Sequence, residues 1–284
     1  MKFHKMMKLH NLLLAASALL VLSACNARPA DAKTDDADTA NPDATLSFDT
    51  RTATKTYKID LPEELKNGKT SDPIYRQTVS LVIPTALAGA DISELNDSII
   101  SIALGGKGMK LNDAIPAWQK KTAEQTGYSV SPVKETADEI SCFDSIDGAV
   151  ITLTPELLVY RITASGYNWG AAHGMSINSY LNFSIKDKKL VTLSTLFTPE
   201  GLAKLPSLIA QAAKANEAAL GPTTITALPE GGNFYLSDYG AVVFAYQPYE
   251  VASYAQGEIK VPLYPYELTD LLTPAGKALL IPAE

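Results

Sequence analysis

The sequence predicts an α+β fold, built mainly on antiparallel sheet with helices packed against it. Strand-like segments follow one another across short turns, and amphipathic segments with helix start and stop signals are inserted between them rather than alternating with them. The region from Phe48 to Glu284 has about 240 residues, which is enough for one large domain or two smaller ones. We expect two, a smaller α/β domain at 48–135 followed by a larger domain at 136–284.

The first 24 residues form a pattern typical of a secretory signal peptide, which we assign to 1–24. Lysines precede an apolar run from Leu12 to Leu22, and this run is too short to cross a bilayer as a helix. The segment ends in Leu-Ser-Ala-Cys at Cys25, which resembles a bacterial lipoprotein signal. That resemblance implies cleavage before Cys25, acylation of this residue with palmitate-type chains, and attachment to a membrane through the lipid. The alternative is an ordinary signal peptide with a chance cysteine at the cleavage point.

The segment 25–47 is predicted to be the lipidated cysteine followed by a disordered acidic tether. From Asn26 to Ser47 there is no aromatic residue, and such a composition cannot bury enough apolar surface to fold. Asn26 is not the aspartate that resembles an inner-membrane retention signal, so we expect the outer membrane. The acidic run in the tether resembles those of surface-exported lipoproteins, although any solvated linker can be acidic. Both the periplasmic face and the cell surface stay open.

The charge balance is acidic and excludes one class of partner. The chain has 24 basic and 31 acidic residues and a net charge of −7; removal of the leader, which holds three lysines and no acids, leaves 21 basic residues and a net charge of −10. Nucleic-acid recognition needs a basic surface, so we expect no nucleic-acid partner. A basic protein would instead be steered towards this surface at low salt. Cys142, which would be the free thiol of the mature chain, is typical of a small core residue.

Two strands and two helices are expected before residue 135. Asp91 followed by Glu94 favours a helix start, and apolar residues at helical spacing continue that helix to Gly105. A second helix is expected from Asp113 to Gln125. The strand-like segments before these helices are 54–59 and 77–83. Pro84 is expected to end the second strand.

The second half is predicted to consist mostly of strands. Thr198 as N-cap and Pro199 as the first helical residue begin a helix that fades near Leu220, and a short closing helix is expected at 267–272. The strands are expected at 141–143, 149–154, 157–164, 175–185, 190–192, 233–236, 240–246 and 257–263.

A glycine-rich turn from Gly166 to Gly174 joins two of these strands and holds the first candidate site. Trp169 and its neighbour Tyr167 are candidates for an exposed binding patch, because Trp and Tyr are common interface anchors. A Trp that covers the open end of the sheet is the alternative. His173 is the mature chain's only histidine, which excludes a His-rich zinc site, and no Gly-x-Ser-x-Gly elbow accompanies it. A histidine in this position is more often a hydrogen-bonded structural residue, with ligand binding or catalysis as the functional alternatives.

Tyr249, Glu250 and Tyr254 form a second candidate site. Glu250 could act as a general acid with Asp238 or Glu267, provided that the two carboxylates lie roughly 5–10 Å apart, as glycoside hydrolysis requires. The alternative is a loop whose buried tyrosines bond to the backbone through their hydroxyls. The sequence holds no phosphate loop, dinucleotide fingerprint or paired-cysteine metal motif, so we predict neither a cofactor nor a metal.

Three motifs carry a resemblance to a known family. They are Gly170-Ala171-Ala172-His173-Gly174 with Tyr180-Leu181-Asn182-Phe183; Leu193–Phe197; and Phe234-Tyr235-Leu236 with Phe244, Pro248-Tyr249-Glu250-Val251, Tyr254 and Gly257. Through them the stretch from Gly166 to Leu272 resembles a family of extracytoplasmic domains that includes the lysozyme-sensing domain of RsiV-type anti-sigma factors and an accessory domain of PdaC-type peptidoglycan deacetylases. The usual turn has adjacent Gly-Gly-Ala-His, and Ala171 replaces the second glycine. Residues 84–104 are similar to the smaller PdaC-like domain that often precedes this one.

These features predict a lipid-anchored protein of the cell envelope that binds its ligand rather than transforming it. The resemblance implies a lysozyme-like enzyme or peptidoglycan as the partner, and an acidic surface suits a basic lysozyme. The candidate binding residues are Trp169, Tyr167, His173, Tyr249 and Glu250. The main alternative is a carboxylate-based hydrolase that acts on cell-wall glycans, and a third is a passive structural lipoprotein.

Overall fold

A computed structural model describes residues 46–66, 72–133 and 140–281, which belong to one compact unit that spans Asn41–Glu284. The predicted signal peptide, Cys25 and residues 26–45 of the predicted tether lie outside the described residues. Leu46 and Ser47, the last two residues of that predicted tether, already belong to the first strand. Within the described ranges, no helix combines the length and the apolar character needed to span a membrane.

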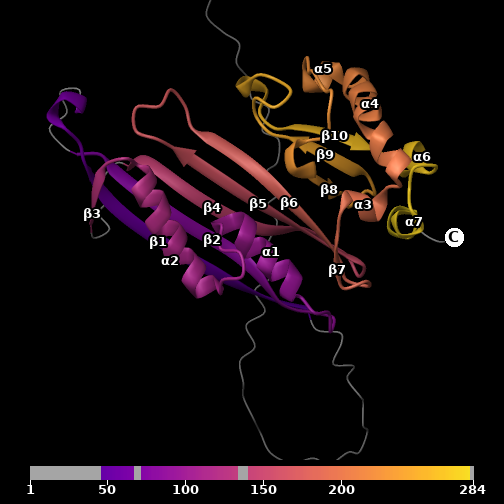
Figure 1. Ribbon diagram of the computed structural model, residues 1–284, viewed down its shortest axis with the longest axis horizontal. Coiled ribbons are helices and arrows are strands. Elements are labelled where there is room, and N and C mark those ends of the chain that lie inside the picture. The colour runs from indigo at the N-terminus through magenta and orange to yellow at the C-terminus, as the bar shows by residue number, and fades with distance from the viewer. Residues whose placement is uncertain (1–45, 67–71, 134–139, 282–284) are drawn as a thin grey trace, which may run out of the picture. The chain divides into compact units, whose positions relative to one another are not determined.

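The described residues form two sheets with helices packed against them (Figure 1). The strands are β1 (Leu46–Asp60), β2 (Ile74–Leu87), β3 (Ser129–Pro132), β4 (Ile140–Leu153), β5 (Leu157–Tyr167), β6 (Met175–Ser184), β7 (Lys189–Val191), β8 (Phe234–Leu236), β9 (Val242–Tyr246) and β10 (Ile259–Leu263). The α-helices are α1 (Ser93–Leu104), α2 (Leu111–Gln125), α3 (Leu193–Leu196), α4 (Pro199–Ala215), α5 (Glu217–Leu220), α6 (Pro265–Leu268) and α7 (Pro274–Leu280). Turns of 3-10 helix are η2 (Glu63–Leu65), η3 (Glu230–Gly232) and η4 (Tyr254–Gln256).

The larger sheet has seven strands in the order β3-β1-β2-β4-β5-β6-β7, and the smaller has three in the order β10-β9-β8. Neighbouring strands are antiparallel except β2 and β4, which run parallel because the chain passes through α1, α2 and β3 between them. The predicted α+β fold with a mainly antiparallel sheet is therefore confirmed. The seven-stranded sheet takes strands from both sides of residue 136, and the division into domains at 48–135 and 136–284 stays a prediction.

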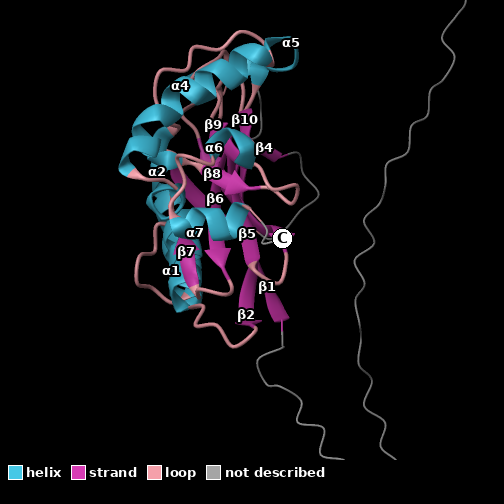
Figure 2. Ribbon diagram, turned by 90° about the vertical axis from the view of Figure 1, so that its right-hand side faces the viewer, coloured by secondary structure: helices cyan, strands magenta, loops and turns pink. Residues whose placement is uncertain are grey.

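The seven-stranded sheet is apolar on one face and mostly polar on the other, except where Val159 joins the second core. Figure 2 shows α1 and α2 on the same side of this sheet, and Leu81, Ile146 and Tyr160 pack in the core on that side. The residues between them in sequence, such as Ser145 and Asp147, point to the other face. This alternation explains why β4 is one continuous strand, where the pattern predicts two at 141–143 and 149–154: a strand with an uncovered face accepts polar residues at every second position.

A second core lies between α4 and the three-stranded sheet. Leu205 and Ile209 of α4 belong to the same buried cluster as Phe244 of β9 and Val261 of β10. The start of α4 agrees with the prediction, since the Thr198 side chain accepts a hydrogen bond from the Gly201 N–H and Pro199 is the first helical residue.

Some predicted boundaries are wrong. Pro84 does not end β2, which continues to Leu87. The pairing of β2 with β1 shifts register at Ser47/Phe48, opposite Pro84, and irregularities of this kind accommodate proline. The closing helix expected at 267–272 is replaced by the two short helices α6 and α7, with the residues between them outside both. The pattern does not predict β3, which is only four residues long and mostly exposed.

Candidate functional site

The glycine-rich turn is the connection of the hairpin formed by β5 and β6. Gly170 has a φ of +78°, a backbone conformation that favours glycine. A Cβ atom on Gly174 would lie 2.9 Å from the carbonyl oxygen of Gly166, so the backbone passes too close there for a side chain. The turn places His173 against the loop between β9 and β10.

His173 and two tyrosines of that loop form an aromatic cluster. The His173 ring stacks on the ring of Tyr254, with centroids 3.9 Å apart and an interplanar angle of 23°. Its Nε2 atom lies 3.1 Å from the hydroxyl oxygen of Tyr249, and the Tyr254 hydroxyl donates to the carbonyl oxygen of Gly174 at 2.6 Å. The structure therefore brings His173 of the first predicted site together with Tyr249 and Tyr254 of the second.

The hydrogen bonds of His173 show which of its nitrogens is protonated. Nδ1 lies 2.9 Å from the carbonyl oxygen of Gly174, which can only accept, so Nδ1 is the donor. In the neutral ring Nε2 then accepts from the Tyr249 hydroxyl. Nε2 therefore holds the turn to the loop, while Nδ1 bonds within the turn itself, and this use of both nitrogens favours the structural interpretation of this histidine.

Tyr249 is the exposed member of the cluster. Its side chain is 58% exposed, and its backbone has a φ of +71°. Residues other than glycine seldom adopt this left-handed conformation, and bulky residues adopt it least. The loop therefore holds a large aromatic side chain in a strained position at the surface.

Trp169 and Tyr167 pack in a different place. Both are half-buried against a cluster whose buried members are Tyr57, Ile59, Leu61, Tyr75, Ala123 and Cys142. The Tyr167 hydroxyl donates to the carbonyl oxygen of Ala171 inside the turn, at 3.1 Å. These contacts fit the alternative in which Trp169 covers the end of the sheet.

Glu250 binds two backbone N–H groups. Its Oε1 accepts from Glu230 at 2.6 Å and its Oε2 accepts from Gln247 at 2.8 Å. Asp238 and Glu267 lie beyond the opposite end of β9, a strand of five residues that spans about 17 Å. The structure therefore does not bring Glu250 together with either predicted carboxylate partner.

Two side-chain amides take the place of a strand along the edge of β6. Gln247 accepts from the Asn178 N–H at 2.8 Å and donates to the Asn178 carbonyl at 3.0 Å. Asn233 accepts from the Tyr180 N–H at 3.1 Å and donates to the carbonyls of Asn178 and Ala245, at 2.9 and 3.2 Å. Since Ala245 belongs to β9, these amides link the seven-stranded sheet to the three-stranded one.

A polar cluster lies beside this link. Glu258 accepts from the Tyr180 hydroxyl and from the Asn178 side chain, each at 3.0 Å, and pairs with Lys260 at 3.0 Å. Burial, and then the Glu258 carboxylate, raise the pKa of Tyr180 well above its usual value. The Tyr180 hydroxyl thus remains a donor at neutral pH, and the charge of Glu258 is matched by Lys260.

A row of tyrosines that the sequence pattern does not single out lies at the other end of the three-stranded sheet. The ring of Tyr264 has its centroid 6.4 Å from that of Tyr239 and 5.8 Å from that of Tyr266, to which it is nearly parallel at 8°. Tyr266 is 78% exposed. The sequence feature that could have revealed this row is the placement of tyrosines beside turn residues, in Asp238-Tyr239-Gly240 and Tyr264-Pro265-Tyr266.

A groove of about 700 Å³ follows the edge of β6 between the two cores. Its apolar walls include Ile102 of α1, Leu181 of β6 and Leu202 of α4. Asn178 and Asn233 line it as well, so the amide link between the sheets forms part of its wall.

The described residues hold no group of three His, Cys, Asp or Glu side chains placed to bind a metal ion. Cys142 is a free, buried cysteine, as predicted. Burial, and then the Asp144 carboxylate, raise the pKa of its thiol to about 11. The thiol is therefore uncharged at neutral pH.

Comparison with known proteins identifies a family for part of the chain and relatives for the fold. Residues 194–266 match a family described as "Protein of unknown function (DUF3298)". A crystal structure of a member of the DUF3298 family from Bacteroides fragilis has a TM-score of 0.62 and 21% identity, over 82% of this chain and 96% of that one. A DUF3298 family protein from Pseudomonas aeruginosa has a TM-score of 0.54 and 16% identity, over 85% of this chain and 99% of that one. None of the curated proteins matches.

The matched range includes the loop with Tyr249 and Tyr254 and ends at Tyr266. It does not include His173, which contributes the other half of the aromatic cluster. At identities of 21% and 16% the two solved structures support the fold.

Proposed function

We propose that this chain is a lipid-anchored protein of the cell envelope that binds a basic protein of the lysozyme type. The observation that carries the proposal is Tyr249, which is 58% exposed, has a φ of +71° and is hydrogen-bonded to His173. A strained backbone of this kind costs about 1–3 kcal/mol and is found mostly at functional sites. A tyrosine fixed in advance at the surface loses little freedom on binding, which makes it an effective anchor.

The charges around the exposed tyrosines favour a cationic partner. Glu230 and Glu250 lie in the loops beside Tyr249, while Asp238 and Glu267 flank the tyrosine row. Guanidinium and ammonium groups bind both to tyrosine faces and to carboxylates, so one arginine-rich surface could use both. The net charge, −10 once the leader with its three lysines is removed, adds attraction at longer range. The resemblance to RsiV-type lysozyme-sensing domains supports lysozyme as this partner, by analogy of fold.

The lipid anchor is supported by the Leu-Ser-Ala-Cys pattern that ends at Cys25. In cells given a palmitate analogue, the parent chain should be labelled and recovered with the membranes, whereas the Cys25→Ser variant should be unlabelled. Equal labelling of the two chains would show that the acyl group is elsewhere and contradict this part of the proposal.

Binding is tested by calorimetry of the full chain in detergent with a purified basic lysozyme at low salt. Tyr249→Ala should weaken the affinity about tenfold or more, as truncation of an interface anchor does. Tyr128→Ala provides a matched control, because Tyr128 is also an exposed tyrosine but lies just before β3, at the opposite edge of the main sheet.

Three results would count against the proposal. Absence of measurable binding to lysozyme overturns the choice of partner, and equal binding by the Tyr249→Ala variant overturns the choice of surface. Catalytic release of sugar fragments from purified peptidoglycan would replace a binding protein with a hydrolase.

A further inference from the structure

β1 has a long edge to which no strand of the described residues is paired over most of its length. β1 pairs with β2 as far as Lys58, but β3 covers its outer edge only from Tyr57 to Asp60. The Val133 N–H donates to the Thr56 carbonyl, so the even-numbered residues of β1 point their backbone groups outwards. These residues are Phe48, Thr50, Thr52 and Thr54. Such a row of donors and acceptors is a template for pairing with another strand.

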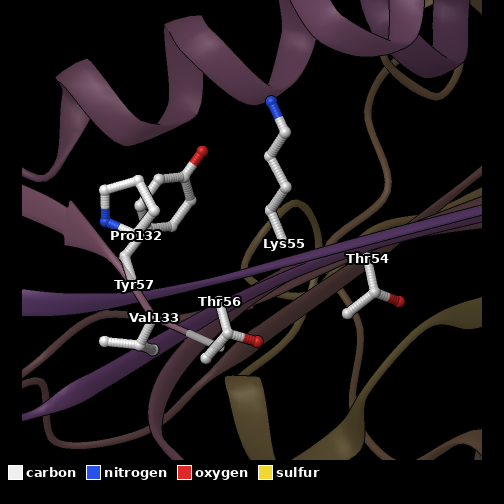
Figure 3. Close-up of a pocket in the computed structure, with 6 residues that line it drawn as sticks. All are labelled: Thr54, Lys55, Thr56, Tyr57, Pro132 and Val133. Carbon is white, nitrogen blue, oxygen red and sulfur yellow. The ribbon is translucent and has the colours of Figure 1, made fainter. Parts of the chain in front are cut away.

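A hollow of about 330 Å³ lies where β3 stops (Figure 3). It is lined by Thr54, Lys55, Thr56, Tyr57, Pro132 and Val133. Figure 3 shows Lys55 and Tyr57 on one side of β1 and Thr54 and Thr56 on the other, as alternation along a strand requires. A strand added to the edge of β1 in line with β3 would end in this hollow.

We infer that the strand that covers this edge is β1 of a second copy of the chain, antiparallel to the first, with the two-fold axis at Thr50. The charges on β1 support a second copy, because the charge pattern of one β1 strand is complementary to that of an identical antiparallel strand. Asp49 and Arg51 form an ion pair of 2.7 Å on the same face of the strand. With the axis at Thr50, Asp49 of each copy lies opposite Arg51 of the other, which gives four alternating charges.

The exposed apolar residues of β1 support the same arrangement. Leu46 is 47% exposed and Phe48 is 36% exposed, and apart from Ala53 the other residues of β1 up to Thr56 are polar. In the proposed register Phe48 lies opposite Thr52 and Leu46 opposite Thr54 of the second copy, so pairing covers both apolar side chains.

Neighbouring registers are less favourable. An axis at Asp49 or at Arg51 places like charges opposite each other. An axis at Thr52 pairs Asp49 with Lys55, but it also places Leu46 opposite Lys58, where β3 already occupies the edge. The axis at Thr50 is therefore the register that combines charge complementarity with an edge to which no described strand is paired.

The register is tested by cysteine cross-linking of the full chain in its membranes. Directly opposed residues of this kind have Cα atoms about 5.5 Å apart, which a disulfide can bridge. Thr50→Cys should therefore give a covalent dimer under mild oxidation. Thr52→Cys is the matched control: its partner is position 48, so two copies of residue 52 lie about 14 Å apart and should stay uncross-linked. The unsubstituted chain controls for the native cysteines.

A second measurement uses charge reversal and the mass of the chain in detergent, from sedimentation. Arg51→Asp should raise the dissociation constant of the dimer about tenfold or more, since like charges replace both ion pairs. The double variant Asp49→Arg with Arg51→Asp should restore the original value, whereas Lys55→Glu should leave it unchanged. A chain that sediments as a monomer and gives no Thr50 cross-link overturns the inference. A Thr50 cross-link to a protein of another mass, or an equal cross-link from Thr52→Cys, overturns it as well.

Discussion

Replacement of Asn233 by alanine should destabilise the protein by about 2–4 kcal/mol. The side chain of Asn233 accepts from the Tyr180 N–H and donates to the carbonyls of Asn178 and Ala245. In the variant the Asn178 carbonyl still accepts from Gln247, but the other two groups lose the partner that this side chain gives them. Tyr180 is 8% exposed and Ala245 is 0% exposed, so water does not readily replace the amide. Each buried group left without a partner costs about 1–3 kcal/mol.

The assay is urea unfolding followed by tryptophan fluorescence, with the slope of the transition recorded as well as its midpoint. Asn216→Ala is the matched control. The Asn216 side chain makes a single bond, to the Ala212 carbonyl at an exposed helix end, and its loss should cost about 1 kcal/mol or less. Asn233→Asp should be at least as destabilising as Asn233→Ala at neutral pH, because a carboxylate then faces two carbonyl oxygens. If the unfolding free energies of Asn233→Ala and Asn216→Ala lie within about 0.5 kcal/mol of each other, the Asn233 amide does not hold the two sheets together and the reasoning fails.

Three further outcomes follow from the structure. Burial, and then the Asp144 carboxylate, raise the pKa of Cys142 to about 11, so alkylation of its thiol at pH 8 should be about 100-fold slower than alkylation of an ordinary thiol. The contribution of this shift to folding stability is present below pH 9 and is lost as the pH rises towards 11. Alkylation at the ordinary rate would contradict the raised pKa. Trp169→Ala should lower the unfolding free energy by about 1–3 kcal/mol and leave lysozyme affinity unchanged, because the side chain packs on the core; a loss of affinity with unchanged stability would reverse this assignment. Tyr249→Phe and His173→Phe both remove the hydrogen bond between these two side chains, so in calorimetry the double variant should bind lysozyme as weakly as His173→Phe alone; additive losses of affinity would show that this bond does not position Tyr249.

Local patterns in the sequence predict many of the elements. The Thr198-Pro199 start of α4 is read correctly because capping depends on residues within one turn of each other. The hairpin of β5 and β6 is also local, since the strands adjoin their turn. β4 is the instructive exception: Ser145 and Asp147 look like a break in the strand until the sheet is seen to have an uncovered face.

The junction of the two sheets could not be predicted, because its partners are far apart in sequence. Asn233 lies 55 residues from Asn178, and Gln247 lies 69 residues from it. An asparagine and a glutamine in loops give no local sign that they will replace a strand. The same holds for the aromatic cluster, in which His173 and Tyr249 are 76 residues apart. The sequence singles out the members of this cluster, but only the folded structure shows that they are in contact.

The strained position of Tyr249 is maintained because its loop is held from several sides. The carboxylate of Glu250 accepts from two backbone N–H groups, the amide of Gln247 pairs with Asn178 of β6, and His173 holds the tyrosine hydroxyl. At roughly 1 kcal/mol for each hydrogen bond, these contacts together exceed the 1–3 kcal/mol of backbone strain. They come from separate parts of the chain, including strand β6 and the hairpin turn. The placement of Tyr249 therefore depends on the contact between the two sheets, and a substitution that separates the sheets should remove the binding site even if it lies far from the ligand.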